Sequence, residues 1–155
     1  MLFGSVLGIV LVVSVLFGLS QCKEPGNVFD LAVGQCFNDP EELVVVSDID
    51  VVPCEEPHHY EVYAVVSLDS TTGYGFYTAG FPYPGDSIID RIADAECRER
   101  FDAFVGLPYP YSILEIISLR PSRESWEVLH DREIICVLLH LGRTLMEGSM
   151  EGSGI

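Results

Sequence analysis

The first 22 residues contain no charged side chain, whereas all 24 acidic and all 8 basic residues lie beyond them. The apolar run from Met1 to Ser20 is about 20 residues long. As an α-helix it would span roughly 30 Å, the thickness of the hydrocarbon core of a membrane. The run has neither a polar face nor caps, which disfavours a buried helix of a globular domain. We therefore expect residues 1–22 to be a membrane anchor or a signal segment, which leaves residues 23–155 to fold.

Three kinds of membrane segment fit residues 1–22. A retained transmembrane anchor fits the length, and a cleaved signal peptide fits the small residues Gly18 and Ser20. A lipoprotein signal would end at Cys22, although Gln21 stands where such signals have a small residue. No basic residue precedes the run, which also leaves open a true start upstream. In all three cases the Lys- and Arg-poor remainder is expected to face outside the cytoplasm.

The charge of residues 23–155 excludes one class of partner. The chain has a net charge of −16, and between Lys23 and Arg91 it has thirteen acidic residues but neither Lys nor Arg. Such a surface repels phosphate backbones and anionic lipid head groups. We therefore expect no nucleic-acid binding, and membrane attachment through residues 1–22 alone.

Four cysteines follow the apolar segment: Cys36, Cys54, Cys97 and Cys136. An even number of cysteines in a small exported domain predicts disulfides, and four cysteines allow three connectivities. A zinc site is disfavoured because no CxxC or HxxxH spacing occurs and because the compartment is oxidising. We expect no metal and no cofactor.

The pattern of apolar residues predicts a small α+β domain, with one main helix packed on an antiparallel sheet. Asp86 or Ser87 is expected to cap the helix, and Gly106 to end it. Residues 23–27 are read as a linker, 28–141 as the domain and 142–155 as a disordered tail. A strand or hairpin is predicted at 43–52, strands at 60–68, 112–119 and 131–141, the helix from its cap at 86 or 87 to about 105, and a short helical turn with Trp126 inward at 121–129.

The predicted helix also favours one disulfide pairing. Its apolar stripe runs through Ile89, Ala93, Cys97, Phe101 and Phe104, so Cys97 faces the core. Cys136 lies on the core face of the strand at 131–141. The two are natural partners, which leaves Cys36 with Cys54.

Few patterns in the sequence are typical of a catalytic site. The sequence has no phosphate-binding Gly-rich loop, GxSxG or HExxH. His58, His59 and Glu61 could form a metal site or an acid–base pair, but adjacent His residues point opposite ways on a strand. We prefer a structural His58 whose ring packs near Cys54 and bonds a backbone carbonyl. Two further hypotheses are weak calcium binding by scattered carboxylates and ligand binding by the aromatic, Gly-rich loop 73–83. The carboxylates are Glu41, Glu42, Asp48, Asp50, Glu55 and Glu56.

Several segments, in order, resemble the actinobacterial septum formation domain. They are VFDLAVGQCFNDP, VVPCEEPHHYEVYAVV, YPGD, AECRERFDAFVG and SWEVLHDREIICVL. The likeness covers about residues 28–140, and its most specific positions include Cys36, Cys54, His58, Glu61, Trp126, Arg132 and Cys136.

The resemblance implies a short membrane-anchored or lipoprotein-type chain with one extracytoplasmic domain. It also implies a non-catalytic role in septum formation, by binding a division protein, another envelope protein or a cell-wall component. One alternative is an exported ligand-binding module that uses the loop 73–83. Another is an envelope hydrolase with His58 and Glu61 as its acid–base pair.

Overall fold

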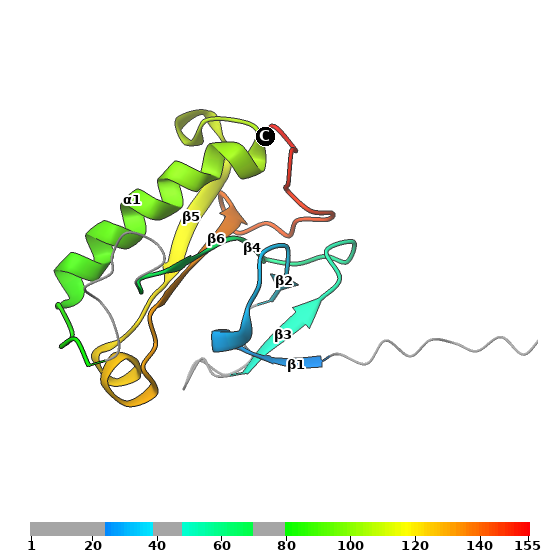
Figure 1. The fold of residues 1–155 in the computed structure, drawn as a ribbon. Helices are drawn as coiled ribbons and strands as arrows, with labels where there is room; N and C mark the ends of the chain where they lie inside the picture. The colour runs from blue at the N-terminus through cyan, green and yellow to red at the C-terminus, as the bar shows by residue number, and fades with distance from the viewer. Residues whose placement is uncertain (1–23, 39–47, 70–79) are drawn as a thin grey trace, which may run out of the picture.

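The computed structural model describes residues 24–38, 48–69 and 80–155, and it confirms the predicted α+β class. A six-stranded antiparallel sheet has the order β1-β3-β2-β4-β6-β5, and the helix α1 covers part of one face (Figure 1). The strands are β1 (Glu24–Asn27), β2 (Cys36–Phe37), β3 (Asp48–Val52), β4 (Tyr60–Ser67), β5 (Leu114–Leu119) and β6 (Glu133–His140), and the helix is α1 (Asp86–Val105). Short helical turns lie at Val28–Asp30, Tyr109–Tyr111 and Ser125–Leu129.

Strand β6 is the centre of the domain because it pairs with β4 on one side and β5 on the other. Its alternate side chains enter two separate apolar clusters. Ile134, Cys136 and Leu138 pack toward α1. Ile135, Val137 and Leu139 pack with residues of β2, β3 and β4 on the opposite face. Burial on both faces explains why the run IICVLL contains no polar side chain.

The helix α1 was predicted with nearly correct bounds, and its buried stripe is Ile89, Ala93, Cys97, Phe101 and Val105. This stripe ends at Val105 instead of Phe104, which is half-buried beside it. Gly106 ends the helix in the left-handed conformation as predicted, with φ 82°. The predicted side-chain cap is wrong. Gly85 is the N-cap residue, and the carboxylate of Asp86 instead accepts a hydrogen bond from the Tyr83 hydroxyl.

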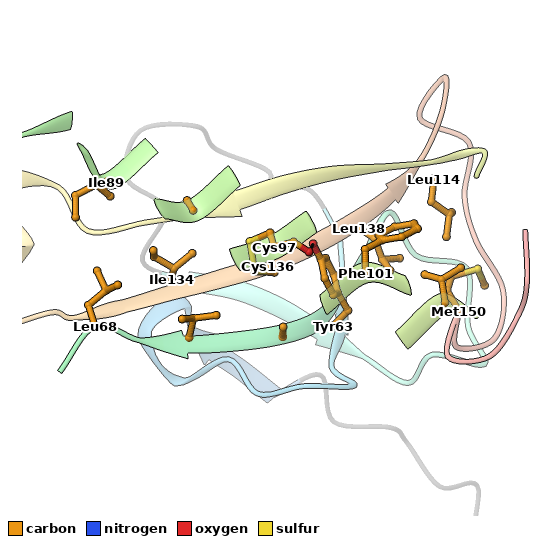
Figure 2. Close-up of a cluster of buried hydrophobic side chains, with 14 of the residues drawn as sticks. Tyr63, Leu68, Ile89, Cys97, Phe101, Leu114, Ile134, Cys136, Leu138 and Met150 are labelled. Atoms are coloured by element: carbon orange, nitrogen blue, oxygen red, sulfur yellow. Dashed lines mark hydrogen bonds between the residues drawn. A yellow bond between two sulfur atoms is a disulfide. The ribbon is translucent and has the colours of Figure 1, made fainter. Parts of the chain in front are cut away.

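The predicted disulfides, Cys36–Cys54 and Cys97–Cys136, are both present. Figure 2 shows the second disulfide at the middle of the larger of the two apolar clusters, the one that packs toward α1, where it joins α1 to β6. The Tyr63 hydroxyl, from β4, donates to the carbonyl of Cys97 at 2.8 Å. Helix, central strand and neighbouring strand are therefore tied together at one point of the core.

Residues 142–155 form an ordered segment, so the prediction of a disordered tail is wrong. Met146 and Met150 are buried, and Met146 forms an antiparallel bridge with His58. Further along, the backbone N–H groups of Gly152 and Gly154 donate to the carbonyls at the end of α1. In Figure 1 this segment (red) runs beside the end of α1. The segment is ordered by hydrogen bonds and side-chain contacts with the rest of the domain. Such contacts do not require a periodic pattern of apolar residues within the segment.

Several predictions lie outside the described residues. They include the nature of residues 1–22, the first half of the strand at 43–52, the calcium candidates Glu41 and Glu42, and loop residues 73–79. Within the described ranges, no helix has the length and apolar character needed to cross a membrane.

Candidate functional site

The structure brings together two of the residues that the sequence singled out. His58 lies just before β4 and Glu61 within it, and both are fully buried next to the Cys36–Cys54 disulfide. A ring nitrogen of His58, a carboxylate oxygen of Glu61 and Sγ of Cys36 all lie within 4.8 Å of one another. We call Cys36, Cys54, His58 and Glu61 the His58 cluster.

The local backbone fixes the ring of His58. Its N–H and C=O both bond to Met146, and its Nδ1 lies 2.8 Å from the carbonyl oxygen of Glu56. Because a carbonyl only accepts, Nδ1 carries the proton. The predicted bond to a backbone carbonyl, close to the disulfide, is thus what the ring makes. The other nitrogen, Nε2, is buried without a hydrogen-bond partner among the described residues.

Glu61 is held by the C-terminal segment. The Ser149 hydroxyl donates to Oε1, and the backbone N–H of Met150 donates to Oε2 at 2.7 Å. Sequence reasoning missed both partners because residues 142–155 have no periodic pattern. The one hint in the sequence is that the segment contains the apolar residues Leu145, Met146 and Met150, although their spacing does not say which of them are buried.

His59 does not join this cluster. Its ring lies on Asn38, with Nδ1 2.9 Å from Oδ1 of that amide. The two adjacent histidines therefore point to different surroundings, as expected for neighbours on an extended chain.

Trp126 belongs to a second site, which is built around Arg132. The guanidinium of Arg132 lies over the indole ring, with its central carbon 3.7 Å from the ring centroid. The same side chain donates through one nitrogen to the carbonyls of Trp126 and Asp131. The indole N–H donates to the carbonyl of Phe81 at 2.7 Å. The stack thus joins the turn Ser125–Leu129, the start of β6 and the end of the aromatic loop.

Burial lowers the pKa of Arg132 from its ordinary value, and the neighbouring carboxylate of Asp131 opposes that effect. The group stays cationic at neutral pH because an arginine pKa starts so high. Asp131 also accepts from the Ser125 hydroxyl and from the backbone N–H of Glu133. These bonds fix the geometry of the turn that leads into β6.

An open cleft of about 730 Å³ lies beside Arg132. We call it the Arg132 cleft; its lining residues are Phe29, Ser67, Asp69, Leu129, His130, Asp131, Arg132 and Glu133. Phe29 and Leu129 are large apolar side chains exposed to solvent at this cleft, and Val128, next to Leu129, is exposed as well. The lining contains three carboxylates and one guanidinium, so the cleft is acidic as well as apolar.

The loop hypothesis concerned residues 73–83, of which 80–83 are described. Phe81 and Tyr83 are half-buried against the larger core cluster, and Tyr83 lies edge-on to Trp126. This end of the loop therefore packs on the domain.

Comparison with protein families gives one match. The model of the family described as septum formation matches residues 33–153, which is most of the chain. The chain belongs to the septum formation family. The matched range of this septum formation domain continues past residue 141 and so includes the segment that holds Glu61. No match was found among curated proteins or among solved structures.

Proposed function

We propose that this chain acts in cell division as a non-catalytic protein outside the cytoplasm, and that it binds a partner through the Arg132 cleft. Membership of the septum formation family is the observation that carries the role in division. Location, lack of catalysis and mode of binding each rest on separate support.

Two features support a location outside the cytoplasm. The domain has two disulfides, which form and persist in oxidising compartments. Residues 1–22 form an uncharged apolar segment that can tether it to the membrane.

The His58 cluster supports a non-catalytic role. A hydrolase needs an acid and a base within reach of its substrate. His58 and Glu61 are both fully buried, and both oxygens of Glu61 already accept hydrogen bonds from the C-terminal segment. Neither group can touch a wall polymer in this arrangement, and unchanged wall hydrolysis after His58→Ala would agree with that.

The Arg132 cleft supports partner binding. Exposed apolar side chains that line a cleft are typical of interaction sites. Asp69, Asp131 and Glu133 add negative charge there. By charge complementarity, the partner is a segment of an envelope or division protein that presents apolar and basic side chains.

The experiment combines localisation with a matched pair of substitutions. A fluorescently tagged chain is imaged in dividing cells that lack the native copy, as wild type, Leu129→Asp and Leu141→Asp. The two leucines have similar exposed fractions, 60% and 56%, but only Leu129 lines the cleft. We expect septal enrichment for wild type and Leu141→Asp, and loss of enrichment for Leu129→Asp at unchanged abundance.

Two results would count against the proposal. An even distribution around the envelope, with normal septa after deletion, would argue against division. Equal enrichment of both variants would keep the role in division but remove the cleft as the binding surface.

A further inference from the structure

The His58 cluster has the composition of a zinc site. Imidazole, carboxylate and two cysteine sulfurs are the side chains that bind Zn²⁺ in proteins. Bonds of about 2.0–2.3 Å in a tetrahedral site place the ligand atoms roughly 3.3–3.8 Å apart. The atoms of Cys36, His58 and Glu61 already lie within 4.8 Å of one another, and Cys54 is bonded to Cys36. A shift of about one ångström would bring these three atoms to coordination distance, while Sγ of Cys54 takes a fourth position once it has separated from Cys36.

The ring of His58 is already in the form that a metal ligand needs. A metal-bound histidine usually donates its other ring N–H to a carbonyl or carboxylate, which fixes the tautomer and the orientation. Here Nδ1 is bonded to the carbonyl of Glu56, so the lone pair is on Nε2. Nε2 is fully buried without a hydrogen-bond partner among the described residues. A buried polar atom in this state is rare and calls for an explanation.

The carboxylate of Glu61 is likewise held in place by hydrogen bonds from neighbouring groups. Ser149 and the backbone of Met150 each donate one hydrogen bond to the carboxylate. Each carboxylate oxygen can accept more than one bond, so a free lone pair remains for a metal ion. The supporting bonds orient the group and lower the cost of moving it into place.

What the cluster lacks is thiolate, because its two sulfurs are joined. We propose that the His58 cluster is a zinc site that the Cys36–Cys54 disulfide keeps closed, and that reduction of this disulfide opens it. A dithiol reductant supplies two electrons and two protons, and becomes a disulfide itself. The cluster then holds two thiols, which release two protons when both bind Zn²⁺ as thiolates. The resulting ligand set is Cys36, Cys54, His58 and Glu61.

The two disulfides differ in access, so reduction can be selective. Cys54 is half-buried in a turn, so its disulfide is the more accessible of the two to a dithiol. Cys97 and Cys136 are both fully buried between α1 and β6. Mild treatment is therefore expected to reduce Cys36–Cys54 first.

The test starts with the full-length wild-type chain in detergent. It is treated with a low concentration of dithiol, freed of reductant without oxygen, and titrated with Zn²⁺ against a competing chelator. We expect one Zn²⁺ per reduced chain and none per oxidised chain. Alkylation followed by mass spectrometry should show that Zn²⁺ protects Cys36 and Cys54, while Cys97–Cys136 stays oxidised.

Substitutions then identify the ligands. Loss of a residue that only hydrogen-bonds to a metal ligand usually weakens metal binding tenfold or more. We therefore expect His58→Gln and Glu61→Gln each to raise the Kd for Zn²⁺ by at least about tenfold. The matched control is His59→Gln, because His59 is adjacent in sequence but packs on Asn38; it should change the Kd less than about twofold. Co²⁺ in the reduced wild-type chain should show the absorption of a tetrahedral site with thiolate ligands.

Three results would overturn the proposal. One is a reduced wild-type chain that keeps its folded circular dichroism spectrum but binds no Zn²⁺. Another is Zn²⁺ binding of equal strength by the oxidised chain. The third is an equal loss of binding in His58→Gln and His59→Gln, which would indicate unspecific coordination by free thiols.

Discussion

Met150 donates its backbone N–H to the carboxylate of Glu61 at 2.7 Å, across 89 positions of sequence. This bond ties residues 142–155 to β4 at the point where β4 also borders the Cys36–Cys54 disulfide. The segment is therefore part of the core, and its side chains can be tested as core residues.

Replacing Met150 by Ala should destabilise the domain by about 2–5 kcal/mol, because it removes a buried side chain and leaves a cavity. Urea unfolding measures the change. Leu145→Ala is the matched control, since Leu145 lies in the same segment but is exposed; it should change stability by less than about 0.5 kcal/mol. Equal effects of the two substitutions would contradict the described packing.

The two disulfides should contribute unequally to stability. They close loops with sequence separations of 39 residues for Cys97–Cys136 and 18 for Cys36–Cys54. Chain entropy alone gives about 4 and about 3 kcal/mol respectively. We expect the Cys97→Ala/Cys136→Ala variant to lose more free energy of unfolding than the Cys36→Ala/Cys54→Ala variant, because it also leaves a cavity between α1 and β6. A larger loss for Cys36→Ala/Cys54→Ala in urea unfolding would argue against this order.

Arg132→Lys should destabilise the turn beside the cleft, although it keeps the positive charge. An ammonium group cannot lie flat on Trp126 and also reproduce the planar fork of donors. The loss of bonds to the two carbonyls should cost about 1–3 kcal/mol in thermal or urea unfolding. Arg120→Lys, in an exposed ion pair with Asp90, is the control and should cost less than about 1 kcal/mol.

Stability should fall in alkaline solution as tyrosines ionise. Burial, followed by the hydrogen bond to Asp86, raises the pKa of Tyr83 from 10.0 to about 12. Burial also raises the pKa of Tyr63. A raised pKa in the folded state favours the neutral form. The stability that each neutral tyrosine adds to the folded state is therefore complete below pH 10. For Tyr83, this stability is lost as the pH rises toward 12.

Urea unfolding across this pH range, without thiols, measures the loss. Tyr83→Phe should flatten the decline. Tyr111→Phe, at a tyrosine that is 77% exposed, should leave it unchanged. An identical decline in all three proteins would remove Tyr83 as a cause.

The helix and strands whose apolar residues recur at regular spacing could be predicted from the sequence. The four-residue spacing of Ile89, Ala93, Cys97 and Phe101 identified α1 and turned Cys97 toward the core. Together with the core strand that carries Cys136, this indicated both disulfides. The apolar run of β6 indicated a core strand, but not that both of its faces are buried.

The rest depends on contacts between distant segments. The cap of α1 was misread because Gly85 adopts a positive φ of 99° and Asp86 turns to Tyr83 instead. Residues 142–155 were misread because their bonds go to Cys54, His58, Glu61, Phe104 and Val105, which no local pattern reveals. The sequence brought His58 and Glu61 to notice, but the partners of their polar atoms came from the structure.

The position of Met146 and Met150 after every strand and helix of the domain affects the order of events during biosynthesis. A nascent chain that has emerged only as far as β6 has its helix and all of its strands, but not the side chains that complete its core. Glu61 would then be without the donors that satisfy it. The domain can therefore reach its final fold only after residue 150 has left the ribosome, and shortened products should be preferred substrates for proteases.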